Sequence, residues 1–173
     1  MSATAARAWR AFTVRPRAEK RVAARLRGQG LEVLLPLRTA LHQWSDRLRR
    51  VEVPLFQGYV FAHVSERERL DALTADGVVR TVGFGGVLAE VSPDEVALIR
   101  ALAEVPGEVE AVARRAFPAG AEVVLVNGPL RGVRGTVAGH PREQYLTVDV
   151  PSLRQSLRVQ VPADWAMRPP DGA

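Results

Sequence analysis

The chain of 173 residues contains no cysteine and no apolar run that approaches the length of a membrane span. The lack of cysteine excludes a disulfide framework, thiolate metal sites and a cysteine nucleophile. A bilayer-spanning helix needs about 20 apolar residues in succession. The segment from Met1 to Trp9 includes Arg7 and has no uninterrupted signal-peptide core. We therefore expect a cytoplasmic protein that makes no membrane contact.

Residue patterns that accompany catalysis or metal binding are missing too. His42, His63 and His140 are isolated from one another, and none has a second ligand at a metal-binding spacing. The glycines of residues 83–86 do not form a dinucleotide fingerprint, and those of residues 128–135 lack the Lys-Ser/Thr of a phosphate loop. Both groups are better explained as turns. We expect no enzyme activity, no metal and no cofactor.

The net charge of +5 conceals an uneven distribution along the chain. Residues 7–50 hold 12 basic and 3 acidic side chains, residues 51–113 hold 4 and 11, and residues 114–173 hold 8 and 5. A basic first segment indicates either a surface that faces nucleic acid or an ordinary solvated surface. The charge counts alone do not separate these two interpretations.

The first hundred residues alternate between strand and helix patterns. The expected elements are a strand over 9–15, a helix over 17–27, a strand over 31–35, a hairpin over 38–53, a strand over 56–64, a short helix after 65, a strand over 78–82 and a helix after 92. Ser65 with Glu68, and Ser92 with Glu95, have capping-box spacing at the starts of two of these helices. The short connections favour an α/β sandwich over residues 1–104, with a mainly antiparallel sheet flanked by helices.

The pattern changes after residue 104. Residues 105–118 contain two prolines and little periodicity, which is typical of a linker. Four short β-rich runs follow, separated by turn residues, over residues 122–127, 134–138, 145–150 and 156–161. Such runs predict a small β-barrel over residues 119–166, followed by a tail over 167–173. The fold class expected for the whole chain is therefore α+β.

Basic residues gather on one face of the first helix and at the tip of the hairpin. The candidate nucleic-acid-binding residues are Arg15, Arg17, Lys20, Arg21, Arg25, Arg47, Arg49 and Arg50. Several cations on one helix face can approach several phosphates together and release their counterions. The alternative is a solvated helix beside a core.

The few aromatic residues form a second candidate site. Tyr59 and Phe61 share a face of the expected strand over 56–64, while Phe56 precedes the Gln57-Gly58 bend and is free to turn to either side. Phe84 is a further candidate member of this group. The cluster is either part of an ordinary core or a concave apolar docking site for a partner's helices.

Four motifs in this order resemble those of the NusG/RfaH/UpxY family. The first is Trp-Arg-Ala-Phe-Thr-Val-Arg over 9–15 with Glu-Lys-Arg-Val over 19–22, and the second is Pro-Leu-Phe-Gln-Gly-Tyr-Val-Phe over 54–61. The third combines Gly-Val-Val-Arg over 77–80, Phe-Gly-Gly over 84–86 and Ser-Pro-Asp-Glu-Val over 92–96, and the fourth is a KOW-like stretch over 123–135. Each motif is weak alone, but their order and spacing are specific. The resemblance extends from about residue 9 to about residue 165.

The resemblance implies a monomeric, non-enzymatic transcription elongation factor. In such factors the N-terminal domain docks onto the clamp helices of the largest RNA polymerase subunit and suppresses pausing, and Phe56, Tyr59, Phe61 and Phe84 match its pocket. Arg15, Arg21 and Arg25 match a helix face near upstream or non-template DNA. The C-terminal barrel is implied to be an SH3-like KOW domain that recruits a ribosomal small-subunit protein or Rho. Its motif and partner loop comprise Gly128, Pro129, Gly132, Gly135, Leu153 and Arg154.

Two departures from the family pattern bear on the role within it. Gln57 stands where the family usually has proline, and Leu153-Arg154 replace the Phe-Gly-Arg of housekeeping members. With Phe84-Gly85-Gly86, the second departure favours an operon-specific antiterminator over a housekeeping NusG that couples polymerase to Rho or the ribosome. An RNA-binding or ribosome-associated KOW protein is a further alternative, and an unspecific nuclease is a more distant one.

Overall fold

The computed structural model describes residues 5–105, 120–138, 145–159, 166–167 and 169. The chain forms two compact units, one of Met1–Leu37 with Pro54–Val96 and one of Arg38–Val53 with Ala97–Ala173. Each unit is described by itself below. The boundaries expected at residues 104 and 119 stay a prediction, because residues 106–119 lie outside the described part.

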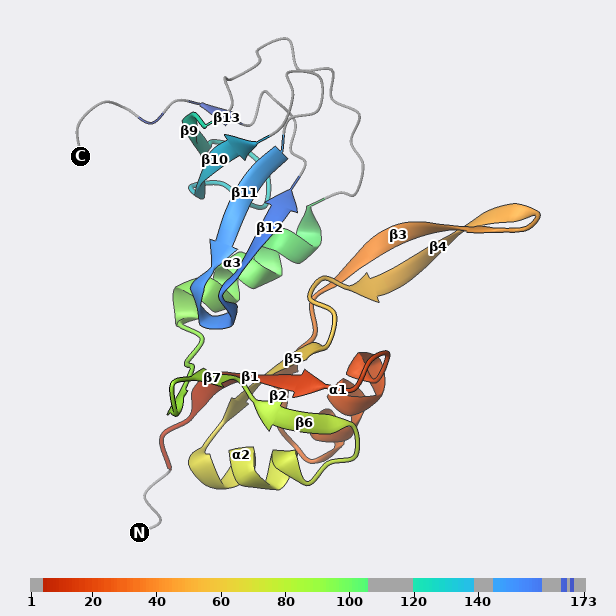
Figure 1. Ribbon diagram of the computed structural model, residues 1–173, viewed down its shortest axis with the longest axis vertical. Coiled ribbons are helices and arrows are strands. Elements are labelled where there is room, and N and C mark those ends of the chain that lie inside the picture. The colour runs from red at the N-terminus through yellow and green to blue at the C-terminus, as the bar shows by residue number, and fades with distance from the viewer. Residues whose placement is uncertain (1–4, 106–119, 139–144, 160–165, 168, 170–173) are drawn as a thin grey trace. The chain divides into compact units, whose positions relative to one another are not determined.

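The first unit is built on a four-stranded sheet. Its strands are β1 (Ala8–Val14), β2 (Glu32–Leu34), β5 (Tyr59–Val64) and β6 (Val78–Thr81), in the order β2-β5-β1-β6 (Figure 1). All three neighbouring pairs are antiparallel, and β1 lies against β5 with Phe12 opposite Val60. The expectation of a mainly antiparallel sheet in a mixed α/β fold is confirmed.

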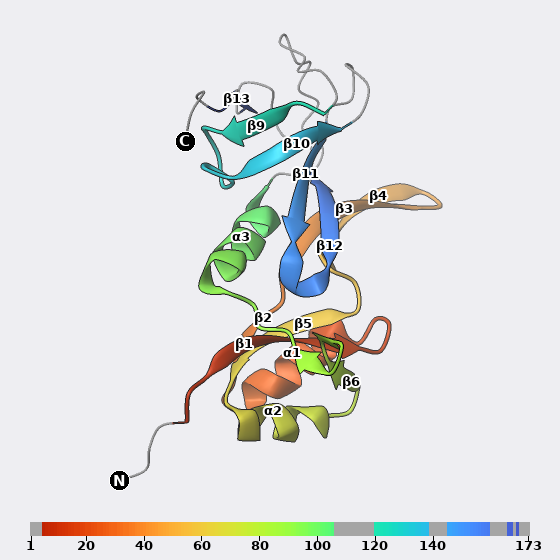
Figure 2. The same ribbon diagram turned by 60° about the vertical axis from the view of Figure 1, so that its left-hand side comes forward.

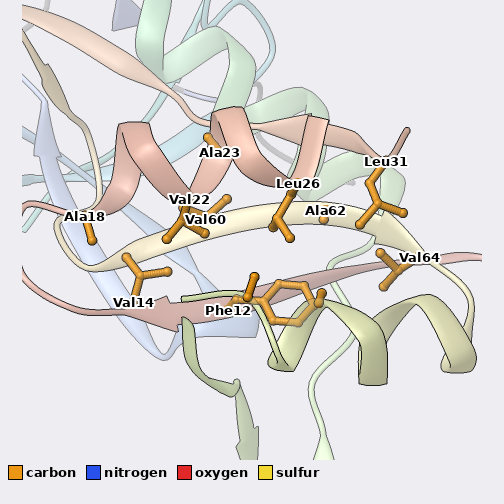
Figure 3. Packing of buried hydrophobic residues seen from close by; sticks show 12 residues of the cluster. Phe12, Val14, Ala18, Val22, Ala23, Leu26, Leu31, Val60, Ala62 and Val64 are labelled. Atoms are coloured by element: carbon orange, nitrogen blue, oxygen red, sulfur yellow. The ribbon is translucent and has the colours of Figure 1, made fainter. Parts of the chain in front are cut away.

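Two helices cover one face of this sheet. Helix α1 (Glu19–Gly28) buries Val22, Ala23 and Leu26, as its 3.6-residue period predicts. These side chains join a core cluster with Phe12 and Val60, to which Ala72 of helix α2 (Glu66–Leu73) also belongs. Figure 3 shows side chains of α1, β1 and β5 meeting in this layer. Each large apolar side chain buried here contributes roughly 1.5–3 kcal/mol to folding.

The start of α2 is held by the predicted capping box. The Ser65 hydroxyl accepts from the Glu68 backbone N–H at 3.3 Å, and the Glu68 carboxylate accepts from the Ser65 N–H at 2.8 Å. Arg7 Nε donates to the same carboxylate at 3.0 Å. The hydrogen bond from Arg7, followed by that from Ser65, stabilises the charged carboxylate and lowers the pKa of Glu68 to about 2. The second capping box, between Ser92 and Glu95, is also present.

A small hairpin that the sequence patterns did not predict precedes helix α3 (Pro93–Glu104). Its strands are β7 (Gly83–Phe84) and β8 (Val87–Leu88). The turn residues Gly85 and Gly86 have φ values of 59° and 79°. Positive φ at both central positions is the requirement of a type I′ two-residue hairpin turn, which glycine meets without steric cost. The interpretation of these glycines as a turn is therefore confirmed for Gly85 and Gly86, whereas Gly83 belongs to strand β7.

The second unit contains a hairpin and a five-stranded antiparallel sheet. Strands β3 (Leu37–Trp44) and β4 (Arg47–Pro54) form the hairpin. The sheet has the order β12-β11-β10-β9-β13, from β9 (Glu122–Leu125), β10 (Arg134–Ala138), β11 (Tyr145–Val150), β12 (Gln155–Val159) and β13 (Ala166–Met167). A short 3-10 helix, η1 (Pro151–Leu153), joins β11 to β12. The ribbons of β11 and β12 lie side by side in Figure 2.

The four strands expected after residue 119 are present, with β13 added at one edge of the sheet. β13 pairs with β9 through Ala166 and Met167, so a strand reaches into the segment predicted to be a tail. Within the described residues the sheet is open between β12 and β13, so the structure does not show a closed barrel. The SH3-like barrel stays a prediction.

In the part of the chain that the structure describes, no helix is long and apolar enough to cross a membrane. The same residues contain no group of three or more His, Asp or Glu side chains placed to hold a metal ion.

Candidate functional site

The face of the first sheet opposite α1 and α2 carries the candidate aromatic residues. Because side chains alternate along a strand, Val60 and Ala62 point into the helix-covered core and Tyr59, Phe61 and His63 point the other way. The antiparallel register adds side chains of β1 to this second face, since Tyr59 lies opposite Thr13, Phe61 opposite Ala11 and His63 opposite Trp9. We call this surface, with Phe56, the aromatic face.

Two of its aromatic rings pack against each other. The rings of Phe56 and Phe61 meet edge to face, with centroids 5.8 Å apart and an interplanar angle of 76°. Both side chains are buried, at 2% and 0% exposure, whereas Tyr59 is partly exposed. The two interpretations of the sequence therefore apply to different residues: Phe56 and Phe61 are packed as a core, and Tyr59 reaches the surface.

The loop before β5 is held by a carboxylate from α1. Glu19 is buried, and its Oε1 accepts from the backbone N–H of Gly58 at 2.8 Å. The Val14 N–H donates to the Gly58 carbonyl at 2.9 Å, and Gly58 has a φ of 81°. Glu19 therefore fixes the bend that places Phe56 against Phe61. The sequence analysis missed this role, although an acidic residue in a helix otherwise lined with arginine was a signal for it.

Phe84 comes from the β7–β8 hairpin, which lies in the same unit. It is partly exposed and lies opposite Val87, whose side chain is 71% exposed. A Cβ added to Gly83 would lie 2.6 Å from the Val87 carbonyl oxygen, so only glycine fits at that position. The hairpin therefore brings further apolar side chains to the surface of the first unit.

Trp9 and His63 extend the aromatic face toward the other end of the strands. Their rings stack with centroids 5.3 Å apart and an interplanar angle of 23°. The His63 Nδ1 lies 3.4 Å from a carboxylate oxygen of Glu32. Neither Trp9 nor His63 was among the predicted site residues, because their pairing depends on the register of strands that are distant in sequence.

Three of the predicted basic residues gather around one carboxylate. Guanidinium nitrogens of Arg15, Arg21 and Arg25 lie 3.4, 3.9 and 3.7 Å from carboxylate oxygens of Asp76. Arg25 also donates to the Asp76 backbone carbonyl at 3.3 Å. We call Arg15, Arg21 and Arg25 the arginine cluster. With Asp76 it carries a net charge of +2, and all four side chains are at least 43% exposed.

The other predicted basic residues are distributed more widely. Arg17 and Lys20 are exposed, and Arg17 has an unusual φ of 63° at the bend between β1 and α1. Arg47, Arg49 and Arg50 are exposed on β4, in the second unit. The structure thus assembles part of the predicted set on one surface and assigns the hairpin arginines to the other unit.

The predicted KOW turn joins β9 to β10. Gly128 and Gly132 have φ values of 74° and 88°, and the Gly132 N–H donates to the Leu125 carbonyl at 2.6 Å. Pro129 is partly exposed in this turn, and the following Leu130 is buried. Gly135 belongs to β10, opposite Val123.

The predicted partner loop follows β11. Leu153 is 4% exposed at the end of η1, so this side chain packs inward. Arg154 is exposed and adopts a left-handed conformation with a φ of 50°. Of the two predicted contact residues, only Arg154 therefore presents its side chain to solvent.

Comparison with known proteins agrees with this fold. The family described as "Transcription termination factor nusG" matches residues 7–100, which is more than half of the chain. Fold and family match define a transcription factor of mixed α/β architecture. The chain belongs to the NusG family.

Solved structures give a consistent result for the fold. A chain from "Domain interaction in Thermotoga maritima NusG" is 17% identical, with a TM-score of 0.61, and the match covers 94% of this chain and 97% of that one. A chain of the MjSpt4:Spt5 complex in conformation B is 16% identical over 92% of this chain and 95% of that one, but its TM-score of 0.32 is too low to bear on the fold. The chain matches none of the curated proteins.

Proposed function

We propose that this protein is a transcription elongation and antitermination factor that binds the clamp helices of the largest RNA polymerase subunit. The observation that carries the proposal is the aromatic face, where Tyr59 is partly exposed beside the packed Phe56–Phe61 pair. A partly exposed aromatic ring on a rigid apolar support is the kind of anchor that dominates protein interfaces. Phe84 supplies a further ring from the β7–β8 hairpin.

The arginine cluster is proposed to contact upstream or non-template DNA while polymerase is bound. Three exposed guanidiniums within 4 Å of one carboxylate form a concentrated positive site, and guanidinium groups match phosphate geometry well. Such contacts are independent of sequence and salt-sensitive. Polymerase docking would provide the specificity, and the arginines would fix the factor against the nucleic acid.

The proposed role is operon-specific. The sequence of the partner loop supports it, because Leu153 and Arg154 replace Phe-Gly-Arg and Leu153 is packed inward. A loop that lacks an exposed aromatic residue offers a weaker apolar anchor to a partner. The C-terminal sheet is proposed to be a KOW barrel, and a contact of this barrel to a ribosomal small-subunit protein or Rho belongs to the housekeeping alternative. The alternative is a housekeeping factor, and genome-wide occupancy rather than occupancy at a few operons would favour it.

Polymerase docking can be tested with Tyr59→Ala in the full chain. Truncation of an aromatic hot spot at an interface raises Kd about tenfold or more, which corresponds to at least ~1.4 kcal/mol. We expect this loss for binding to core polymerase and no change for binding to free DNA. Val79→Ala is the matched control, because Val79 is also an exposed apolar residue of the first sheet, at 60% exposure on β6.

The same experiment separates the proposal from its main rival. The observation that favours an RNA-binding or ribosome-associated protein is the exposed arginine cluster. The affinity of such a protein would depend on these arginines and not on the aromatic face. For such a protein, Tyr59→Ala would leave polymerase binding at the level of Val79→Ala. That result would refute docking through the aromatic face.

A further inference from the structure

The tip of the β3–β4 hairpin exposes an aromatic ring that the proposed function does not use. Trp44 is 60% exposed, and Leu41 and Leu48 on the same hairpin are 55% and 66% exposed. Strand β3 ends at Trp44 and β4 begins at Arg47, so Ser45 and Asp46 form a two-residue turn. Trp44 is therefore the last strand residue before the turn, on the two-stranded ribbon seen in Figure 1.

The charge of this hairpin tip indicates what its partner is. Arg47, Arg49 and Arg50 are all exposed, and Asp46 is the acidic residue beside them. Within the described residues, no ion pair joins any of the three arginines to a carboxylate. A two-residue turn places Trp44 directly opposite Arg47. The tip thus combines an exposed indole ring with several cations, a combination that suits a negatively charged partner with a flat surface.

We propose that the β3–β4 hairpin binds single-stranded nucleic acid, with Trp44 stacked on an unpaired base and Arg47, Arg49 and Arg50 against the phosphates. Stacking of a base on an aromatic side chain contributes about 1–3 kcal/mol and tolerates any base. A duplex covers the faces of its bases, so the Trp44 contribution is confined to single strands. This proposal rests on the proposed function in one respect, the source of the single strand. A factor bound to polymerase would meet it as the unpaired DNA of the transcribing complex.

The test uses the full chain and a labelled oligothymidylate of roughly ten nucleotides, with a duplex of the same length for comparison. Trp44→Ala should raise Kd for the single strand about tenfold and leave duplex binding unchanged, whereas Trp44→Phe should retain most of the affinity. Leu48→Ala is the matched control, because it removes an exposed apolar side chain from the same hairpin without removing a ring. Trp44 is exposed, so these variants should fold normally, which circular dichroism will check.

The contribution of the hairpin arginines can be measured separately from that of Trp44, through the salt dependence of binding. Arg47→Ala combined with Arg49→Ala should reduce the slope of log K against log salt by about 0.7 for each phosphate of the single strand that is no longer neutralised. The intrinsic fluorescence should also be quenched by the oligonucleotide, and Trp44→Phe should abolish most of that quenching. These two readouts assign the stacking and the electrostatic parts of binding to different side chains.

Three results would overturn the proposal. They are an equal loss in Trp44→Ala and Leu48→Ala, an equal loss for single strand and duplex, and a loss of polymerase binding in Trp44→Ala with oligonucleotide binding intact. The last result would make the hairpin tip a protein-docking surface. Failure of the proposed function is recognised separately, because it would appear in Tyr59→Ala and would not alter oligonucleotide binding.

Discussion

Asp76 controls the charge of the arginine cluster, and its neutralisation should strengthen DNA binding. Asp76→Asn keeps a side-chain oxygen that accepts from Arg15 and leaves the backbone carbonyl that accepts from Arg25, and it removes one negative charge. The net charge of the site rises from +2 to +3, because the carboxylate lies within 4 Å of all three guanidiniums. In the wild type, a phosphate must compete with this carboxylate for the same donors.

The expected magnitude follows from counterion release. Each phosphate neutralised on duplex DNA contributes about −0.9 to the slope of log K against log salt. If the charge freed in Asp76→Asn engages one further phosphate, the slope becomes steeper by about 0.9. If the two proteins converge in affinity near 1 M salt, this slope makes the variant roughly fivefold tighter at about 0.15 M salt.

The assay is a salt titration of duplex binding by fluorescence anisotropy. Asp71→Asn is the matched control, because Asp71 is an exposed carboxylate of the same unit and its replacement changes the net charge equally. A slope equal to that of Asp71→Asn would show that Asp76 acts only through overall charge. Weaker binding by Asp76→Asn would instead show that the carboxylate is needed to hold the arginines together. Either outcome would refute the idea that Asp76 competes with phosphate.

Two further predictions concern stability. Because hydrogen bonds lower the pKa of Glu68 from 4.5 to about 2, their contribution to folding is present above pH 4.5 and is lost as the pH falls toward 2. Urea denaturation should therefore give Arg7→Ala a slightly lower free energy of unfolding than the wild type at neutral pH, because an exposed ion pair contributes little. This difference should shrink on acidification. A difference that stays constant with pH would contradict the role of Glu68. Gly83→Ala should cost roughly 1–3 kcal/mol and weaken polymerase binding, because its Cβ would lie 2.6 Å from the Val87 carbonyl oxygen. Gly28→Ala, which meets nothing within 4 Å, is the control and should leave the melting temperature nearly unchanged.

Local sequence patterns were sufficient to predict the helices and strands whose defining residues lie within a few positions of one another in the sequence. The period of α1 and the Ser65–Glu68 capping box are examples, and both are present as predicted. The β7–β8 hairpin was missed because strands of two residues are too short to show alternation. Closure of the C-terminal barrel was expected from strand spacing, but spacing does not determine which edges pair.

The candidate site was only partly predictable, because its geometry depends on contacts between distant segments. Helical periodicity in the sequence identified Arg21 and Arg25, and Arg15 was added from the end of the preceding strand. No local pattern places Asp76 among them, since that residue lies 61 positions beyond Arg15. The stack of Trp9 on His63 likewise depends on strand register. Periodicity therefore predicts which residues share a face, and tertiary pairing decides what each face contacts.

Helix α1 links the two candidate surfaces of the first unit. It carries Arg21 and Arg25 of the arginine cluster. Its first residue, Glu19, accepts a hydrogen bond from the N–H of Gly58, the residue before β5. The Val14 N–H also donates to the Gly58 carbonyl, while the next residue, Arg15, belongs to the cluster. A shift of α1 would therefore move the arginines and the Phe56 bend together. This connection is built from one part-buried side-chain hydrogen bond and one backbone hydrogen bond, so docking through the aromatic face would also restrict the arginines, and we expect the two contacts to act together.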